Sequence, residues 1–256
     1  FYAVYESRYV SGVVAGMKLA QMIEDGTITA ENAKIGYVGA FPFAEVISGF
    51  TSFFLGVRSV CPSATMDVTY TNSWASFDLE KEAAEALVAQ GCVLIAQHAD
   101  TTGAPTACQA QGVPCVGYNI SMLPVAPNTA LTSAAGDWGA YVTYAVKCLI
   151  DGEEIARDWC KGYAEGAVYT TELNDSIVAP GTAEKVAELE EAFKAGTVKV
   201  FDTSTFTVNG ETLTSYTTAY GLEGIEMVSD GEFHESSVRS APYFDILIDG
   251  ITAVVE

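Results

Sequence analysis

The chain has 256 residues, of which 49% are hydrophobic, 12 are basic and 33 are acidic, giving a formal charge of −21. This length allows one large domain or two modest ones, and the composition supports a sizeable core. So acidic a surface repels phosphate backbones and argues against a nucleic-acid partner. No run of 18 apolar residues is present, so no membrane span is expected. The first residues lack the pattern of a signal peptide, which fits a mature or truncated chain as well as a cytosolic one.

Residues 1–25 are predicted to form an amphipathic helix. Tyr9, Val13 and Met17 recur at helical spacing, and Gly26 follows the end of the run. Because the chain begins inside a helix with no strand before it, a segment is expected to be missing upstream.

Residues 34–139 organise the rest of the chain. Short apolar segments alternate there with helix-like segments, and polar or aromatic residues follow each apolar segment. This alternation predicts an α/β fold with a parallel sheet that helices cover on both faces. The five predicted strands are residues 35–39, 66–70, 93–96, 114–117 and 129–133.

Most of the segments between these strands are predicted to be helices that pack on the sheet. Apolar residues form a wide stripe through residues 46–57, which is typical of core packing. The next helix is expected to begin near Ser76 or Asp78, because both residue types cap helices, and to end at Gly91. Further helices are predicted at residues 106–111 and 138–151.

The composition changes after Gly152. Residues 166–171 are typical of a strand and residues 182–195 of a helix. The dipeptide Asn209-Gly210 between β-rich runs predicts a β-hairpin near residues 198–216. A turn at Asp230-Gly231 and an apolar run at residues 246–255 follow.

Motifs for nucleophilic catalysis and for phosphate binding are absent. There is no GxSxG elbow, no GxGxxG and no Walker A loop, and the only histidines are His98 and His234. A Ser-His-Asp set would need one of these two histidines. His98 lies near Asp100 at a strand end, where we expect an ordinary polar residue at the lip of the sheet. The sequence therefore favours a binding protein over an enzyme.

No cofactor and no metal site is expected. Asp100 and Asp137 could share a cation, but two carboxylates alone specify little. The six cysteines form no CxxC pair, so we expect mostly buried free thiols and leave open a single disulfide.

Recognition of a flat, polar-edged molecule fits the residues at the strand ends. Ligands of parallel sheets bind outside the carboxyl ends of the strands. Trp74 and Trp138 follow strand ends, and an indole face stacks well on a heterocycle. Packing alone could explain Trp138, and Asp137 could instead cap a helix. The candidate ligand-binding residues are Phe41, Asn72, Ser73, Trp74, Asp100, Asn119, Asp137 and Trp138.

Six short motifs occur in a fixed order along the chain: YESRYVSG at residues 5–12, IGYVGAFPFAEV at 35–46, NSW at 72–74, QHAD at 97–100, GYN at 117–119 and LTS at 131–133. This ordered set resembles the basic membrane protein family, the substrate-binding lipoproteins of ABC importers for purine nucleosides or related bases. The resemblance implies a type I periplasmic-binding-protein fold with two Rossmann-like lobes and parallel sheets.

On this resemblance, residues 33–152 form the second lobe. Residues 1–32 are a remnant of the first lobe, and residues 153–256 return to it and form the hinge region. Family members carry about a hundred further residues upstream, the size of a small domain. The first lobe is thus expected to be incomplete in this chain.

The resemblance also implies a ligand, partners and a location. Trp74 matches the residue that stacks on the purine, and Asp100 and Asn119 match positions that line the cleft. Asp137 and Trp138 stand where nucleoside binders tend to have a lysine, so a nucleobase is as well supported as a nucleoside. The expected partner is the membrane permease of an ABC importer, and the expected location is extracytoplasmic, as a membrane-anchored lipoprotein or a periplasmic protein.

Two other functions remain open from the sequence. The same fold serves as the ligand-sensing domain of transcription regulators, although this chain has no helix-turn-helix motif. A nucleoside-hydrolysing enzyme on the same scaffold would have to use Asp100 and Asp137.

Overall fold

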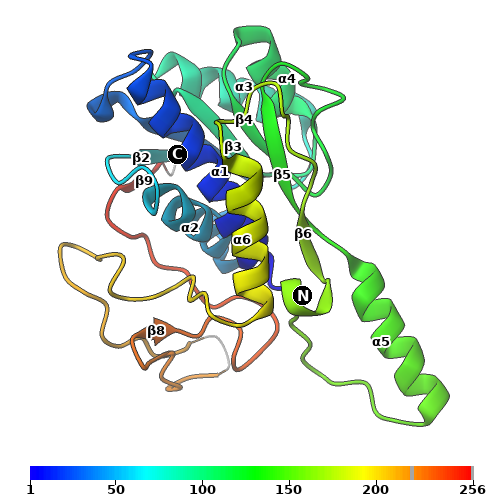
Figure 1. Ribbon diagram of the computed structural model, residues 1–256. Coiled ribbons are helices and arrows are strands. Elements are labelled where there is room, and N and C mark those ends of the chain that lie inside the picture. The colour runs from blue at the N-terminus through cyan, green and yellow to red at the C-terminus, as the bar shows by residue number, and fades with distance from the viewer. Residues whose placement is uncertain (220–221, 255–256) are drawn as a thin grey trace.

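The computed structural model describes residues 1–219 and 222–254, so the last predicted apolar run is described only up to residue 254 (Figure 1). A seven-stranded sheet in the order β6-β5-β4-β3-β1-β2-β9 forms its centre. All neighbouring strands are parallel except β6, which is antiparallel to β5 at one edge. The strands are β1 Lys34–Gly39, β2 Thr65–Tyr70, β3 Leu94–His98, β4 Cys115–Tyr118, β5 Ala130–Gly136, β6 Val168–Thr170 and β9 Ile251–Val254.

The five strands predicted between residues 35 and 133 are confirmed, with ends that shift by up to three residues. Strands β1, β3, β4 and β5 are buried along almost their whole length, because helices cover both faces of the sheet, whereas in β2 only Met66 and Val68 are buried. The predicted strand at residues 166–171 is β6. The apolar run from residue 246 contains β9, which pairs with β2 at the far edge.

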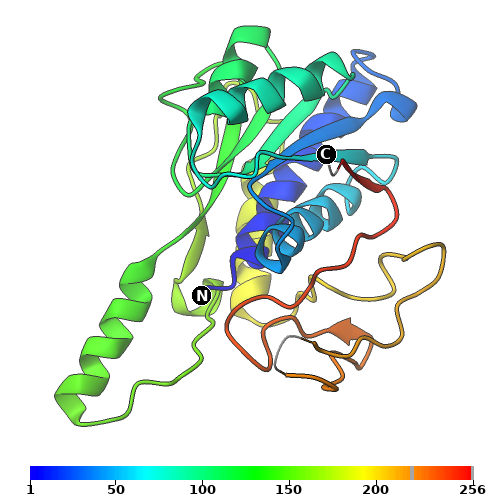
Figure 2. The same ribbon diagram turned by 180° about the vertical axis from the view of Figure 1, so that it is seen from behind.

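Helices pack on both faces of the sheet (Figures 1 and 2). Three lie on one face: α1 Val4–Glu24, α2 Ala44–Arg58 and α6 Thr182–Lys194. Two lie on the other face: α3 Phe77–Ala89 and α4 Gly103–Gln111. Short 3-10 helices are formed by Ala30–Asn32 and Tyr163–Glu165.

Helix α1 differs from the predicted amphipathic helix. Its residues Val4 to Gly16 are buried on most sides, because the helix lies between the sheet, α2 and α6. The first predicted helix is therefore a central element of the core, and even its charged residue Arg8 is fully buried.

Helices α1 and α2 touch backbone to backbone. A Cβ atom added at Gly12 would overlap the carbonyl oxygen of Phe53, and one added at Gly56 would overlap that of Tyr9. At Gly16 the added atom would lie 2.6 Å from the carbonyl oxygen of Val57. The absence of side chains at these glycines lets the two helices approach closely.

Helix α3 begins where the sequence predicts, but its first residues are hydrogen-bonded by a glutamate rather than by the predicted capping side chain. Ser76 is the N-cap residue, and its side chain makes no capping hydrogen bond. The buried carboxylate of Glu80 accepts hydrogen bonds from the backbone N–H of Ser76, at 3.3 Å, and of Thr101. Glu80 thus ties the start of α3 to the loop after β3.

Helix α5, Trp138–Asp151, matches its predicted bounds and extends away from the rest of the molecule (Figures 1 and 2). Only Cys148 of this helix is buried, whereas Leu149 and Ile150 are 71% and 78% exposed. The apolar spacing of the segment predicted the helix correctly but not the face that it buries.

The chain after α6 contains little regular structure. At the predicted hairpin, Asn209 and Gly210 have positive φ angles, and Val208 and Glu211 exchange backbone hydrogen bonds. This single bridge is the only part of the hairpin that forms, since residues 198–207 and 212–216 are not strands. A short hairpin of β7 (Val228–Ser229) and β8 (Glu232–Phe233) surrounds the predicted turn at Asp230-Gly231.

The three-part division into residues 1–32, 33–152 and 153–256 stays a prediction. In this structure segments from all three parts lie around one sheet, because α1, β6, α6 and β9 pack with the elements of residues 33–152. All six cysteines are free thiols, five of them buried. In residues 1–219 and 222–254 we find no helix that is both long and apolar enough to cross a membrane.

Candidate functional site

A cleft of about 520 Å³ opens at the carboxyl ends of the strands. Because β1 to β5 are parallel, the loops that follow them meet at this edge of the sheet. The cleft is lined by Tyr2, Glu45, Trp74, Asp100, Tyr118, Asn119, Gly136 and Trp138. Four of these, Trp74, Asp100, Asn119 and Trp138, are candidates from the sequence.

Hydrogen bonds connect three of the candidate residues. The backbone N–H of Asp100 donates to the carbonyl oxygen of Trp74 at 2.8 Å. The side-chain amide of Asn119 donates to Oδ1 of Asp100, also at 2.8 Å. Asn119 has a positive φ of 64°, a conformation that Asn tolerates better than most residues. The ends of β2, β3 and β4 are thereby held in a fixed arrangement around the cleft.

Aromatic rings form much of the cleft wall. The half-buried indole of Trp74 packs on Phe41, with ring centroids 5.4 Å apart. Trp138 is 51% exposed, and its ring centroid lies 4.9 Å from that of Tyr2. The ring of Tyr2 in turn occupies the space where Gly136 has no side chain. Indole faces at such a site can stack on a planar ligand.

The other candidate residues do not line the cleft. Phe41 lies behind Trp74 and supports its ring. Asn72 borders a separate groove beside Tyr70, and Ser73 belongs to the same turn without reaching the cleft. Asp137 caps α5 by accepting a hydrogen bond from Gly139 at 2.7 Å.

A buried arginine lies behind the cleft. The guanidinium of Arg8 is 4.0 Å from the centroid of the Tyr118 ring and donates one hydrogen bond, of 2.7 Å, to the carbonyl oxygen of Gln97. Its Nε and second terminal nitrogen have no hydrogen-bond partner among the described residues. The sequence signal for Arg8 is that it is the only basic residue among the first 17.

The two carboxyl groups of the cleft hold their protons more tightly than free side chains do. Burial raises the pKa of Asp100, against the lowering effects of Arg8 and Asn119. Burial also raises the pKa of Glu45, and the charge of Asp100 adds to this effect. The site therefore offers two carboxyl groups to the polar edge of a ligand.

The expected position of His98, at the lip of the sheet, is wrong. His98 is fully buried in the core against Tyr118, with ring centroids 4.5 Å apart. Gly49 makes room for it, since a Cβ there would overlap the imidazole. Burial and then the charge of Arg8 lower the pKa of His98 well below its usual range. Neither ring nitrogen has a hydrogen-bond partner in the described structure, so His98 forms no catalytic triad there.

No metal site accompanies the cleft in the described residues. Within that part of the chain, no group of three or more His, Cys, Asp or Glu side chains could hold a metal ion. Asp100 and Asp137, which the sequence left open as a shared cation site, have different roles. Asp100 accepts from Asn119, and Asp137 caps α5.

A mostly parallel sheet with helices on both faces and a cleft at the strand ends is an arrangement that this chain shares with solved periplasmic-binding-protein structures. A solved solute-binding protein of an ABC transporter system from Aeropyrum pernix K1 superposes with a TM-score of 0.64. The match covers 78% of this chain and 65% of that chain, at 19% sequence identity, and it supports the fold alone.

The chain belongs to the family described as ABC transporter substrate-binding protein PnrA-like, whose model matches residues 1–201. This is a family of binding proteins and not of enzymes, so the nucleoside-hydrolase alternative is wrong. A purine-binding protein of Brucella abortus (strain 2308) is 35% identical over 198 residues, which are 77% of this chain and 53% of that protein. A protein of Haloferax volcanii named for ABC-transporter glucose binding is 31% identical over 87% of this chain and 54% of its own length. The chain therefore spans about half the length of these two relatives.

Proposed function

We propose that the chain is the ligand-binding part of an ABC-importer substrate-binding protein and that its cleft takes a purine nucleobase or nucleoside. The observation that carries this proposal is that the indole rings of Trp74 and Trp138 line the same cleft as the hydrogen-bonded pair of Asp100 and Asn119. The rings suit the faces of a bicyclic base, and the carboxyl and amide groups suit its polar edge. The relative from Brucella abortus supports the purine assignment by its name.

The location and the partner follow from the same proposal. A binding protein of an ABC importer works outside the cytoplasm, as a lipoprotein or in the periplasm, and delivers its ligand to a membrane permease. Ligand contact with both sides of the cleft would stabilise a closed arrangement, as in other hinged binding proteins.

Calorimetry tests the ligand class directly. We expect adenine, hypoxanthine, xanthine or their nucleosides to bind, and glucose not to bind. A purine base and its nucleoside, compared side by side, will show whether the absence of a lysine from residues 134–138 excludes ribose. Binding of glucose without binding of any purine would refute the purine assignment and favour the sugar that names the relative from Haloferax volcanii.

Replacing Trp74 by alanine is expected to weaken purine binding at least tenfold. The substitution removes the ring face that the ligand stacks on, and tenfold corresponds to about 1.4 kcal/mol. Trp159→Ala is the matched control, because that indole packs on Tyr141 and Tyr144 outside the cleft. Equal purine affinity of the Trp74→Ala protein and the unmodified protein would remove Trp74 from the site.

A further inference from the structure

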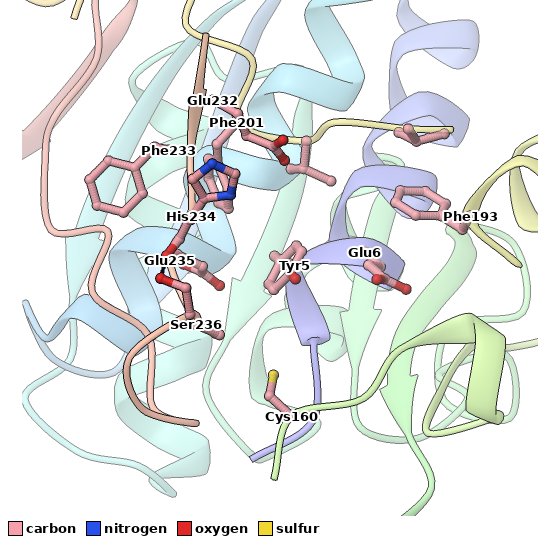
Figure 3. Close-up of a pocket in the computed structure, with 13 residues that line it drawn as sticks. Tyr5, Glu6, Cys160, Phe193, Phe201, Glu232, Phe233, His234, Glu235 and Ser236 are labelled. Atoms are coloured by element: carbon pink, nitrogen blue, oxygen red, sulfur yellow. Dashed lines mark hydrogen bonds between the residues drawn. The ribbon is translucent and has the colours of Figure 1, made fainter. Parts of the chain in front are cut away.

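A second cavity, of about 300 Å³, lies on the other side of the start of α1 and shares no lining residue with the cleft. Figure 3 shows it between the first turn of α1, the strand β8 with the residues that follow it, and Cys160. Phe193 near the end of α6 and the segment at residues 198–201 close it. It is assembled from segments far apart in the sequence, so no local motif marks it.

The wall of this cavity is acidic and aromatic. Three glutamates line it, Glu6, Glu232 and Glu235, and no lysine or arginine does. Glu232 has a partner outside the cavity, since Lys199 lies 3.6 Å from its carboxylate. Glu6 accepts a hydrogen bond of 2.8 Å from the backbone N–H of Tyr163. The aromatic residues on the wall are Tyr5, Phe193, Phe201 and Phe233.

Glu235 is the group that points to a ligand. It lines the cavity and is only 2% exposed, yet neither carboxylate oxygen makes a hydrogen bond of normal geometry to the described residues, and the polar side chain close enough to lower its pKa is Ser48. A buried carboxyl group without a partner is unfavourable unless it is protonated or a cation pairs with it.

The shape and chemistry of the cavity select the kind of cation. The carboxylates repel anions, and none of the described residues forms the three-ligand cluster that a metal ion needs. The volume holds a small organic molecule rather than a bare ion. Aromatic faces beside a carboxylate are a setting in which proteins bind organic ammonium groups.

We propose that this cavity binds a small organic cation with an ammonium group, which pairs with Glu235 while its carbon skeleton packs among Tyr5, Phe201 and Phe233. The rings of Tyr5 and Phe201 are 5.7 Å apart, and those of Phe201 and Phe233 are 6.4 Å apart, so they form a continuous aromatic wall. This site is independent of the purine proposed for the cleft.

Binding to this site depends on pH. Burial raises the pKa of Glu235 to about 8, and the nearby Ser48 hydroxyl opposes this effect. Burial also raises the pKa of Glu6 to about 7. The other titratable groups that line the cavity are Tyr5, Cys160, Glu232 and His234. An alkylammonium group stays protonated up to about pH 10, as the lysine side chain does. Affinity for the cation therefore increases as pH rises from 6.5 to 8.5, because more of Glu235 is ionised.

The probe pair 2-phenylethylammonium and 2-phenylethanol tests the proposal, because the two molecules differ mainly in charge. Calorimetry on the full chain is expected to show ammonium binding about tenfold tighter at pH 8.5 than at pH 6.5. The alcohol should bind more weakly and without this pH dependence. Equal binding of the alcohol, no pH dependence or no binding of the ammonium at all would overturn the proposal.

The variant Glu235→Gln provides a second test of the ammonium site. This variant keeps the shape of the side chain, and it should lose at least tenfold in affinity for 2-phenylethylammonium at pH 8.5. Glu188→Gln is the control, since Glu188 is exposed on α6 and paired with Lys185. Unchanged binding by a folded Glu235→Gln protein would refute the role of Glu235. Trp74→Ala should leave ammonium binding unchanged, which separates this result from the outcome for the cleft.

Discussion

Gly12→Ala is expected to lower the free energy of unfolding by about 3 kcal/mol, the upper part of the usual range for overfilling a packed core. The new methyl group would overlap the carbonyl oxygen of Phe53, which belongs to the α2 backbone and cannot turn aside. Relief requires α1 and α2 to separate, and α1 is enclosed by the sheet and α6. The gain in helix propensity from glycine to alanine, about 1 kcal/mol, offsets only part of this loss.

Urea denaturation followed by circular dichroism measures the effect. Lys18→Ala on the same helix is the control, because its partly exposed side chain makes only a local bond to Gln21, and it should change stability by less than about 0.5 kcal/mol. In the double variant Gly12→Ala/Gly56→Ala, one separation of the helices relieves both clashes. Its loss should therefore be smaller than the sum of the two single losses. Stability of Gly12→Ala equal to that of the unmodified protein would show that the helices are not in backbone contact.

The sheet could be predicted from the sequence because its signal is local. Five apolar runs of four or five residues, each separated by a helix-length segment, leave few arrangements other than a parallel sheet. The same regularity placed Trp74, Asp100 and Asn119 at one edge, since each follows the end of a parallel strand. Asn72 and Ser73 were assigned to the site by the same reasoning. They lie outside the cleft, because side-chain direction in a tight turn depends on backbone angles that composition does not reveal.

Long-range packing explains most of what could not be predicted. Tyr2 lines the cleft although it precedes α1, far from the strand ends in sequence, and Glu45 reaches the cleft from the first turn of α2. The burial of His98 depends on Gly49 in α2, whose missing side chain admits the imidazole. No pattern within either segment indicates that the two meet.

The region after residue 195 shows the limit of turn signals. Asn209 and Gly210 form the predicted turn, but the flanking residues make no ladder. Instead, Thr207 and Gly210 hydrogen-bond the carboxylate of Asp249, and the rings of Phe201 and Phe206 pack on Phe244. A turn motif determines local geometry, whereas strand pairing also requires partners that this segment finds elsewhere.

Stability is expected to fall by about 2.7 kcal/mol between pH 6.5 and pH 8.5, by linkage from two glutamates. In the folded protein burial raises the pKa of Glu235 to about 8 and that of Glu6 to about 7, whereas an unfolded glutamate has a pKa near 4.3. The folded state therefore binds more protons than the unfolded state in this range, and its stability decreases as pH rises. His98 has the opposite sign, because its pKa is lowered in the folded state, but its effect lies below about pH 6.5.

Glu235→Gln should remove more than half of this decline, because Glu235 titrates in the middle of the range and Glu6 mainly at its lower end. Urea denaturation at half-unit pH steps gives the two slopes, with Glu188→Gln as the control that keeps the full decline. The buried carboxylate of Glu235 makes no hydrogen bond of normal geometry to the described residues, so the amide should also make the protein more stable than the unmodified chain at pH 8.5. If the variant and the unmodified protein lose stability in parallel, Glu235 does not hold its proton in the folded state, and the unmodified carboxylate must already be solvated or paired.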